Sequence, residues 1–255
     1  MIEKLSITIP ELTRKEPRSA YVYVPDAFEE DEEQRYPVLY MFDGHNLFFD
    51  EDATYGKSWG LLDFLEENDV PVIVAAVECN HHPNNGRLSE YSPFSFSDST
   101  FGRVRGRGRT TMEWMVNTFK PFIDGEYPTL PEREYTFIAG SSMGGLMSIY
   151  ALTQYNHVFS RAAALSPSLW CDVGKLDRMI CASDIDPNTV LYMDYGSEEL
   201  SNHPHMKKMF GRIATRLLEK GVMLDARIVP YGTHSEASWE QQLPFFINTL
   251  FYGLE

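Results

Sequence analysis

Residues 135–152 read YTFIAGSSMGGLMSIYAL, and this stretch decides the fold. Its first five residues are apolar or β-favouring and predict a buried strand, and a helical pattern begins by residue 146. Between the two lies GSSMGG, which fits the pattern G-x-S-x-G in one register only. Ser142 is then the central serine, because Ser141 would need a glycine at position 139, where the chain has alanine.

A sharp turn between a strand and a helix is typical of a nucleophile elbow. The serine of such an elbow has strained backbone angles, so the residues around it must be small. The helix points its N-terminus at the reacting oxygen, and the amide of Met143 is expected to donate to an oxyanion. A purely structural glycine-rich turn is the alternative. The strand before and the helix after favour Ser142 as a nucleophile.

Strands and helices alternate along the whole chain. Several strand-like runs are continuous in Val, Ile, Ala and Phe, as expected of strands covered on both faces. These runs are 18–24, 36–42, 70–77, 135–139, 162–165, 189–195 and 225–230. Helical patterns fall at 114–123, 146–151, 206–220 and 245–251. The alternation predicts a mostly parallel sheet with helices on both faces, in a single domain over residues 1–255. An acidic run at 29–33 is read as a solvated hairpin loop.

The charge balance limits the partners that the protein can have. The chain has 22 Lys and Arg against 37 Asp and Glu, a formal net charge of −15. Such a surface repels phosphate, so nucleic acid and anionic membranes are not expected as partners, whereas a small neutral ester is. Three cysteines without a CxxC spacing indicate reduced thiols and neither a disulfide framework nor a zinc site. With no apolar leader at the start of the sequence, a cytoplasmic location is expected.

A serine needs a base, and the chain order serine, acid, histidine excludes the histidines before the elbow. His157 follows the elbow helix too closely to leave room for an acid strand. His203 and His205 lie in a turn-to-helix stretch and are expected on the surface. His234 directly follows the last strand, after Gly232, so its ring can return over the carboxyl edge of the sheet. It is the predicted base.

The acid should follow the preceding strand, which ends at Gly196-Ser197-Glu198-Glu199. Asp194 lies inside that strand and is expected to point either into the packing of the sheet or along a covered face. Glu199 is favoured as the residue that orients the imidazole, with Glu198 as the alternative.

Several motifs in this order resemble the esterase D-like family of α/β-hydrolases. These motifs are YMFDG (40–44), RLSEYSP (87–93), GSSMGG (140–145), GSEE (196–199) and GTHS (232–235) followed by Trp239. The family includes siderophore, feruloyl, acetyl-xylan and S-formylglutathione esterases and mycolyltransferases. The resemblance covers about residues 18–250. It implies the α/β-hydrolase fold, with Ser142 as nucleophile, His234 as base and Glu199 as acid.

The resemblance also implies that the backbone amide of His45 is the second oxyanion donor. The residues agree, because Gly44 lets the chain turn across the edge of the sheet. Asp43 is expected to brace that turn. Arg87 and Glu90 are expected to pair and fix their loop, with Arg87 a candidate for substrate contact.

The pocket walls are expected to come from segments 45–60, 80–110 and 165–172. Trp170 is a candidate for substrate contact, within a set of aromatic residues that could line the pocket or pack in the core. The others are Phe48, Phe49, Trp59, Phe94 and Phe96.

Four arginines in seven residues, 103–109, stand out in an acidic chain. An exposed loop that neutralises nearby acid is one reading. The other is that the loop covers the pocket and that Arg105 and Arg107 hold an anionic part of the substrate.

These observations predict a serine carboxylic-ester hydrolase that works through an acyl-enzyme, without cofactor or metal. An acyltransferase on the same scaffold and a non-catalytic binding module are the alternatives. The sequence does not specify the ester or the oligomeric state.

Overall fold

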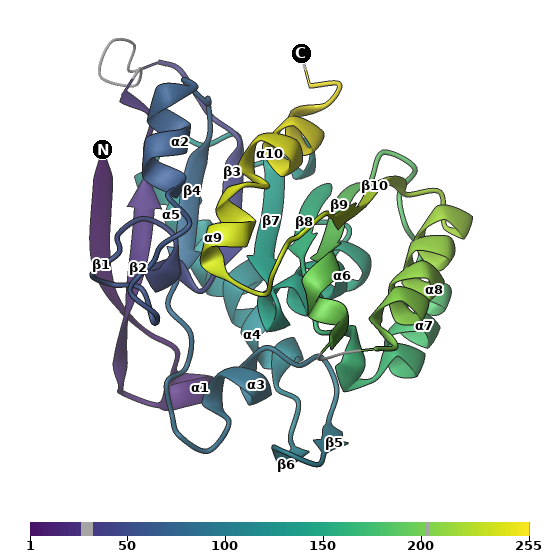
Figure 1. The fold of residues 1–255 in the computed structure, drawn as a ribbon. Helices are drawn as coiled ribbons and strands as arrows, with labels where there is room; N and C mark the ends of the chain where they lie inside the picture. Colours follow the sequence, from purple (N-terminus) through teal and green to yellow (C-terminus); the bar gives the residue numbers. More distant parts are fainter. Residues whose placement is uncertain (27–32, 202–203, 255) are drawn as a thin grey trace.

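The computed structural model describes residues 1–26, 33–201 and 204–254 (Figure 1). Within them, the main sheet has eight strands in the order β1-β2-β4-β3-β7-β8-β9-β10. The strands are β1 (Ile2–Thr8), β2 (Pro17–Tyr23), β3 (Val38–Phe42), β4 (Ile73–Val77), β7 (Thr136–Ser141), β8 (Arg161–Leu165), β9 (Val190–Gly196) and β10 (Met223–Val229). From β4 to β10 neighbouring strands are parallel, and β1–β2 and β2–β4 are antiparallel. The predicted mostly parallel sheet is confirmed.

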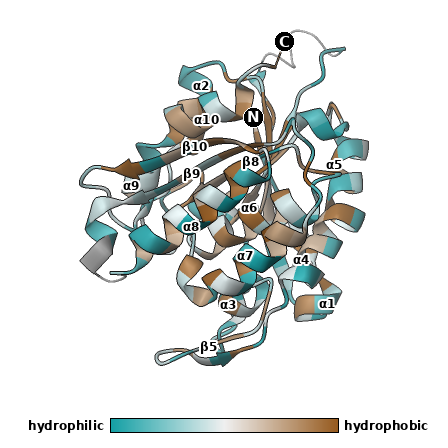
Figure 2. Cartoon of the chain, turned by 90° about the vertical axis from the view of Figure 1, so that its right-hand side faces the viewer, coloured by the Kyte–Doolittle hydropathy of each residue, from teal (hydrophilic) through white to brown (hydrophobic). Residues whose placement is uncertain are grey.

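Both faces of the central strands are covered, which explains their continuous apolar runs. All five residues of β3 are buried. Val38, Tyr40 and Phe42 belong to the hydrophobic core on one face, and Leu39 and Met41 to the core on the other. In Figure 2 the strands are mostly brown, whereas the outer helices mix brown and teal.

Helices complete the two layers. They are α1 (Pro10–Thr13), α2 (Leu61–Glu67), α3 (Gly86–Glu90), α4 (Gly108–Trp114), α5 (Lys120–Glu126), α6 (Met143–Gln154), α7 (Val173–Ala182), α8 (Met206–Glu219), α9 (Glu236–Glu240) and α10 (Leu243–Phe251). Residues of α4 to α8 belong to one core, and residues of α2, α9 and α10 to the other. Within the described ranges, no helix is both long and apolar enough to cross a bilayer.

All seven predicted strands form, but the sequence reading missed three. β1 pairs antiparallel with β2 at the edge of the sheet. β5 (Phe96–Asp98) and β6 (Gly102–Val104) form a separate hairpin inside the region of the four arginines. The acidic run 29–33 lies mostly outside the described residues. The hairpin expected there is not formed, because β4 lies between the flanking strands β2 and β3.

Candidate active site

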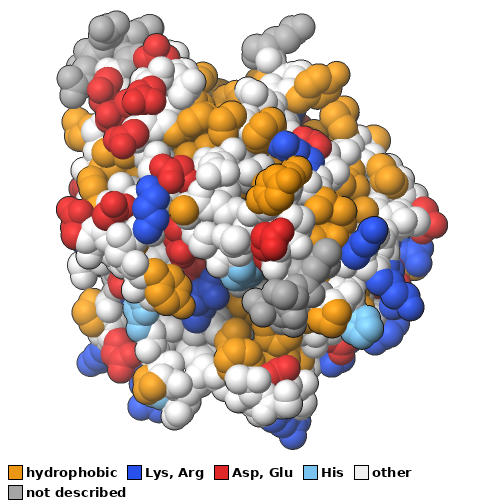
Figure 3. All heavy atoms as spheres, viewed as in Figure 1, with side chains coloured by type: hydrophobic (Ala, Val, Ile, Leu, Met, Phe, Trp, Pro, Cys, Tyr) orange, Lys and Arg blue, Asp and Glu red, His pale blue; other side chains and the backbone are white. Residues whose placement is uncertain are grey.

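A pocket of about 460 Å³ opens beyond the carboxyl ends of the parallel strands. Its lining comes from segments that follow β3, β4, β7 and β10. Ser142 and His234 belong to this lining, with Asp43, His45 and Arg87 among the residues around them. Figure 3 shows histidine and basic side chains at the surface in the middle of this face. The pocket therefore gathers chemically reactive side chains that are far apart in the sequence.

Ser142 directly follows β7 and occupies the N-cap position of α6 with φ 57° and ψ −118°. A non-glycine residue at such angles costs about 1–3 kcal/mol, so the surrounding structure must enforce them. The backbone does so on both sides of the serine. The Ser142 amide donates to the Leu165 carbonyl at 2.9 Å, and its carbonyl accepts from the Ser168 amide at 3.0 Å.

The flanking glycines are required by close approach of the backbone. A Cβ on Gly140 would lie 2.9 Å from the carbonyl carbon of Gly144. A Cβ on Gly144 would lie 3.0 Å from the Cβ of Phe42, and one on Gly145 would lie 2.9 Å from the Leu165 carbonyl oxygen. The small residues of the motif thus let α6 start directly against β3 and β8.

Glu199 and His234 form a charge-assisted hydrogen bond. The Oε2 atom of Glu199 lies 2.7 Å from Nδ1 of His234. The Glu199 side chain is 2% exposed, whereas the His234 side chain is 41% exposed and lies in the pocket. This contact fixes the orientation of the ring and leaves Nε2 for chemistry. Glu198, the alternative acid, accepts a bond from Ser197 Oγ and does not contact the ring within the described residues.

A second layer of hydrogen bonds holds the Glu199 carboxylate. Its Oε1 atom accepts from Ser166 Oγ at 2.6 Å and from the Gly196 amide at 2.7 Å. Ser166 in turn accepts from the indole nitrogen of Trp239 at 3.0 Å. Burial acts to raise the pKa of Glu199. The bonds from His234, Ser166 and Gly196 outweigh burial and hold this pKa below its ordinary value, so the carboxylate is ionised.

Asp194 stands behind this network as predicted, inside β9 and 1% exposed. It accepts from the Ser166 amide at 3.1 Å and from the Tyr192 hydroxyl at 2.8 Å. Burial raises the pKa of Asp194 to about 7. The pKa of Asp194 is therefore above its ordinary value, whereas the pKa of the neighbouring Glu199 is below its own.

The loops that carry Glu199 and His234 touch through two glycines. A Cβ on Gly196 would overlap the backbone of Gly232, and a Cβ on Gly232 would lie 2.9 Å from the Cα of Gly196. The Glu198 amide also donates to the Gly232 carbonyl at 3.0 Å. Backbone contact therefore fixes the acid loop against the histidine loop.

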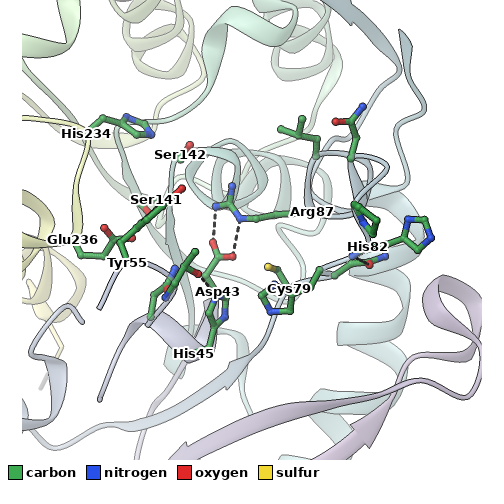
Figure 4. Close-up of a pocket in the computed structure, with 18 of the residues that line it drawn as sticks. Asp43, His45, Tyr55, Cys79, His82, Arg87, Ser141, Ser142, His234 and Glu236 are labelled. Carbon is green, nitrogen blue, oxygen red and sulfur yellow. Dashed lines mark hydrogen bonds and ion pairs between the residues drawn. The ribbon is translucent and has the colours of Figure 1, made fainter. Parts of the chain in front are cut away.

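The Ser142 hydroxyl is bonded away from the base in this structure. Its Oγ lies 3.3 Å from Ser168 Oγ, and no hydrogen bond joins it to His234 among the described residues. Both side chains nevertheless line the same pocket, and Figure 4 shows the imidazole of His234 on the Ser142 side of it. Catalytic hydrogen bonds are often loose without substrate and tighten when it binds.

The two backbone amides expected as oxyanion donors lie at the starts of two helical turns. Met143 is the first residue of α6, and His45 lies in the 3₁₀ turn Gly44–Asn46 that follows β3. The first amides of a helix have no acceptor inside it. Neither amide donates to another group in the described part of the chain. Both remain candidates for this role.

Asp43 and Arg87 form a bidentate ion pair on the wall formed by the β3 and β4 loops (Figure 4). Its two N–O distances are 2.8 and 2.7 Å. Asp43 has φ 57°, which fits its predicted role in bracing the turn. Burial acts to raise the pKa of Asp43, but the charge and hydrogen bonds of Arg87 bring it below its ordinary value.

The predicted Arg87–Glu90 pair is wrong. Glu90 instead bonds Arg18 at 2.6 Å, and both of these side chains are at most 5% exposed. The positions of Arg87 and Glu90 in α3 explain the difference, because Arg87 lies toward the pocket while Glu90 lies toward β2.

Trp170 is not among the residues that line the pocket. Its ring packs on Phe96 and Phe101, with centroid distances of 5.7 and 6.0 Å. None of the other aromatic candidates lines the pocket either, since all of them belong to or pack against the hydrophobic cores. Segments 45–60 and 80–110 contribute to the pocket as expected, and segment 165–172 does not.

The arginines of 103–109 also lie away from the pocket lining. Arg103 belongs to the β5–β6 hairpin, which projects at the bottom of Figure 1. Arg107 donates to the carbonyl of Glu11, and Arg109 pairs with Glu113 one helical turn away. The idea that this loop holds an anionic part of the substrate over the pocket has no support in the geometry.

Of the remaining histidines after the elbow, the two that the structure describes do not line the pocket. His157 and His205 are exposed, and His203 lies outside the described residues. The sequence reading missed Ser166, Ser168 and Glu236. Ser166 and Ser168 directly follow β8, so a search of every strand end for hydroxyl groups could have found them.

Known proteins resemble this chain in sequence. A sequence profile of the family described as "Putative esterase" matches residues 12–246. Uncharacterized protein YbbA of Bacillus subtilis (strain 168) is 28% identical over 212 residues, which is 80% of this chain and 79% of that protein.

Solved structures share the α/β-hydrolase architecture. An IroE-like serine hydrolase from Shewanella oneidensis superposes with a TM-score of 0.73 at 22% identity, covering 97% of this chain and 78% of that one. Siderophore hydrolase EstA from Aspergillus nidulans gives 0.69 at 16% identity, covering 98% and 95%. The enterobactin esterase FES from Shigella flexneri gives 0.72 at 14%, and this chain spans 59% of its length.

Proposed function

Because this chain belongs to the esterase family, we propose that it hydrolyses carboxylic esters through an acyl-enzyme formed on Ser142. The hydrogen bond between Glu199 and His234 carries this proposal. It joins a buried, ionised carboxylate to an imidazole in the same pocket as a serine at elbow geometry. This is the arrangement that activates a hydroxyl nucleophile.

In the proposed first step, Nε2 of His234 takes the proton of Ser142 Oγ as this oxygen attacks the ester carbonyl. Glu199 stabilises the resulting imidazolium through Nδ1. The amides of Met143 and His45 donate to the tetrahedral oxyanion, and loss of one such donor typically costs about 10²–10³ in kcat. The C–O bond of the ester breaks and the alcohol leaves with the proton from His234.

In the second step water attacks the acyl-enzyme while His234 takes its proton. The acyl–Oγ bond breaks, the acid leaves, and the proton returns to Ser142. Before the first step the Ser142 hydroxyl has to turn from Ser168 toward His234. No metal or cofactor takes part in these steps.

The pocket favours small or polar esters over long alkyl esters. Its walls carry the Asp43–Arg87 ion pair, several histidines and asparagines, and a nearly buried Glu236. A long alkyl chain would exclude water from these polar walls without replacing its hydrogen bonds. We expect kcat/KM to fall from p-nitrophenyl acetate to the decanoate. Feruloyl and siderophore lactone esters belong in the same panel, because the structural neighbours include ferulic acid and enterobactin esterases.

A fluorophosphonate probe tests the proposal directly. The wild-type chain should be labelled with one equivalent, and Ser142→Ala should not be labelled, whereas the neighbouring Ser141→Ala should be. An unlabelled wild-type chain would favour the non-catalytic binding module. Product analysis with an added alcohol separates hydrolysis from acyl transfer. The cytoplasmic location stays a prediction, and the three free thiols are consistent with it.

A further inference from the structure

Three potential metal ligands meet at the pocket wall formed by the β3 and β4 loops. One ring nitrogen of His45, one ring nitrogen of His81 and the sulfur of Cys79 all lie within 4.8 Å of one another. All three residues line the pocket, and Figure 4 shows the Cys79 sulfur near His45. They follow two adjacent parallel strands, which explains why residues 34 or more positions apart converge.

The buried nitrogen Nδ1 of His45 has no hydrogen-bond partner within the described residues. His45 is 4% exposed, and its Nε2 atom lies 3.0 Å from Thr54 Oγ1. Leaving a buried polar atom without a partner costs about 1–3 kcal/mol. A bound ion would remove this cost, because the unprotonated nitrogen of a neutral imidazole is a metal ligand.

Both rings are oriented from outside the cluster. Thr54 contacts Nε2 of His45, and Glu78 Oε1 lies 3.0 Å from Nε2 of His81. Metal-binding histidines almost always use the second ring nitrogen for such a contact, often with a carboxylate. Nδ1 of each ring is then the nitrogen that remains for a ligand. Ring stacking alone, with centroids 4.9 Å apart, does not account for the unpartnered Nδ1 of His45.

We propose that His45, Cys79 and His81 form a binding site for a soft divalent transition metal, with Zn²⁺ as the preferred ion. Imidazole and thiolate are the ligands that Zn²⁺ selects, and tetrahedral bond lengths require donor atoms about 3.3–3.8 Å apart. The 54% exposed side chain of His81 can make this small approach. On binding, the Cys79 thiol releases its proton to the buffer and the thiolate bonds the ion.

The proposed ion has three protein ligands, so water completes its tetrahedral shell. It takes no part in the proton transfers between Ser142 and His234, and it binds the ring of His45, whereas the proposed oxyanion donor is the backbone amide of that residue. The C-x-H spacing of Cys79 and His81 differs from CxxC, and the third ligand is distant in sequence. For this reason the cysteine spacings gave no sign of the site.

Titration of the chelator-treated, reduced protein with Zn²⁺ tests the proposal. We expect one ion per chain, with affinity lowered by more than about 100-fold in His81→Ala and in Cys79→Ser. Glu78→Gln should lower it about 10–100-fold, as loss of an orienting carboxylate does. His82→Ala and Cys181→Ser are matched controls, because they remove a neighbouring pocket histidine and the exposed thiol. Both controls should bind like the wild type.

Co²⁺ gives a second readout that does not depend on affinity. The wild type should show a thiolate-to-Co²⁺ charge-transfer band and tetrahedral visible bands, both lost in Cys79→Ser. His81→Ala covers the case in which Cys79→Ser fails to fold, because the His81 side chain is exposed. Zn²⁺ binding that persists unchanged in both variants, or that is lost in Cys181→Ser, would overturn the proposal. So would a wild-type chain that binds no ion.

Discussion

The two sides of the pocket are built on opposite principles. On the triad side, meaning the proposed triad of Ser142, Glu199 and His234, the buried carboxylate accepts from Ser166 and Gly196 and contacts the imidazole. On the β3–β4 side, meaning Asp43, His45, Cys79, His81 and Arg87, a buried imidazole nitrogen has no hydrogen-bond partner in the described part of the chain. Full satisfaction of polar groups favours a fixed geometry for proton transfer. A buried polar atom without a partner favours the binding of an ion from solution.

The largest expected effect is on kcat, and it should come from removing the proposed base, His234. His234→Gln keeps a polar side chain but cannot accept the serine proton at neutral pH. We expect kcat for p-nitrophenyl acetate to fall by about 10⁴–10⁶, as loss of a triad member does in serine hydrolases. The double variant with Ser142→Ala should be no slower than Ser142→Ala alone, because the two residues act as a unit. A further loss in the double variant would mean that His234 has a separate role.

The choice between the adjacent acids gives the next largest effect. Glu199→Gln keeps the size of the side chain and removes the charge beside Nδ1, so kcat should fall by about 10⁴. Glu198→Gln is the matched control and should leave kcat near the wild-type value. If Glu198→Gln were the slower variant, the assignment of Glu199 as the acid would be wrong.

On the β3–β4 side the corresponding test is one of stability. Arg87→Met leaves the 6% exposed Asp43 carboxylate without its cation. Removing one partner of a buried ion pair typically costs 3–5 kcal/mol, so the free energy of unfolding in urea should fall by about 3 kcal/mol or more. Arg109→Met breaks an exposed pair and should cost at most about 1 kcal/mol. Adding Asp43→Asn to Arg87→Met should recover part of the loss.

The last expected effect is a dependence of stability on pH, comparable in size to the loss from Arg87→Met. The pKa of Asp194 rises from 3.8 to about 7 on folding, so the folded state binds this proton more tightly. The stabilisation is complete below pH 3.8 and is lost as the pH rises through about 7, a change of at most about 4 kcal/mol. Asp194→Asn keeps an acceptor without the charge, so its unfolding free energy relative to wild type should be higher at pH 9 than at pH 5.

Equal differences between Asp194→Asn and wild type at both pH values would contradict this assignment. Glu199→Gln offers a check of opposite sign. The folded pKa of Glu199 is depressed, so its stabilisation is present above pH 4.5 and is lost as the pH falls through the folded value. Urea unfolding of both variants across this range distinguishes the two carboxyl groups.

The sequence predicted the central strands and the elbow well because both depend on local patterns. Continuous apolar runs mark strands that are covered on two faces, and the glycines around Ser142 follow from the local chain path. β1 was missed because its burial alternates weakly at a solvated edge, with residues such as Lys4 facing water.

A residue of the candidate site could be predicted from the sequence only where it comes directly after a predicted strand. Ser142, Glu199 and His234 could be found in this way, and the structure brings Glu199 and His234 together. The partner of Arg87 could not, because Asp43 and Glu90 are both acidic and only the position of α3 decides between them. Aromatic residues in the expected wall segments suggested a lining, but Phe48 and Trp59 are buried in the same core as residues of α2 and α10.

Gly196 and Gly232 cross in backbone contact, so the loops that carry Glu199 and His234 can change only together. Since neither position has room for even a methyl group, no single substitution there can be absorbed by a neighbouring side chain. This junction can be exchanged only if both chain paths are rebuilt at once. Engineers who wish to regraft the base onto another scaffold should therefore transplant the pair of loops as one piece.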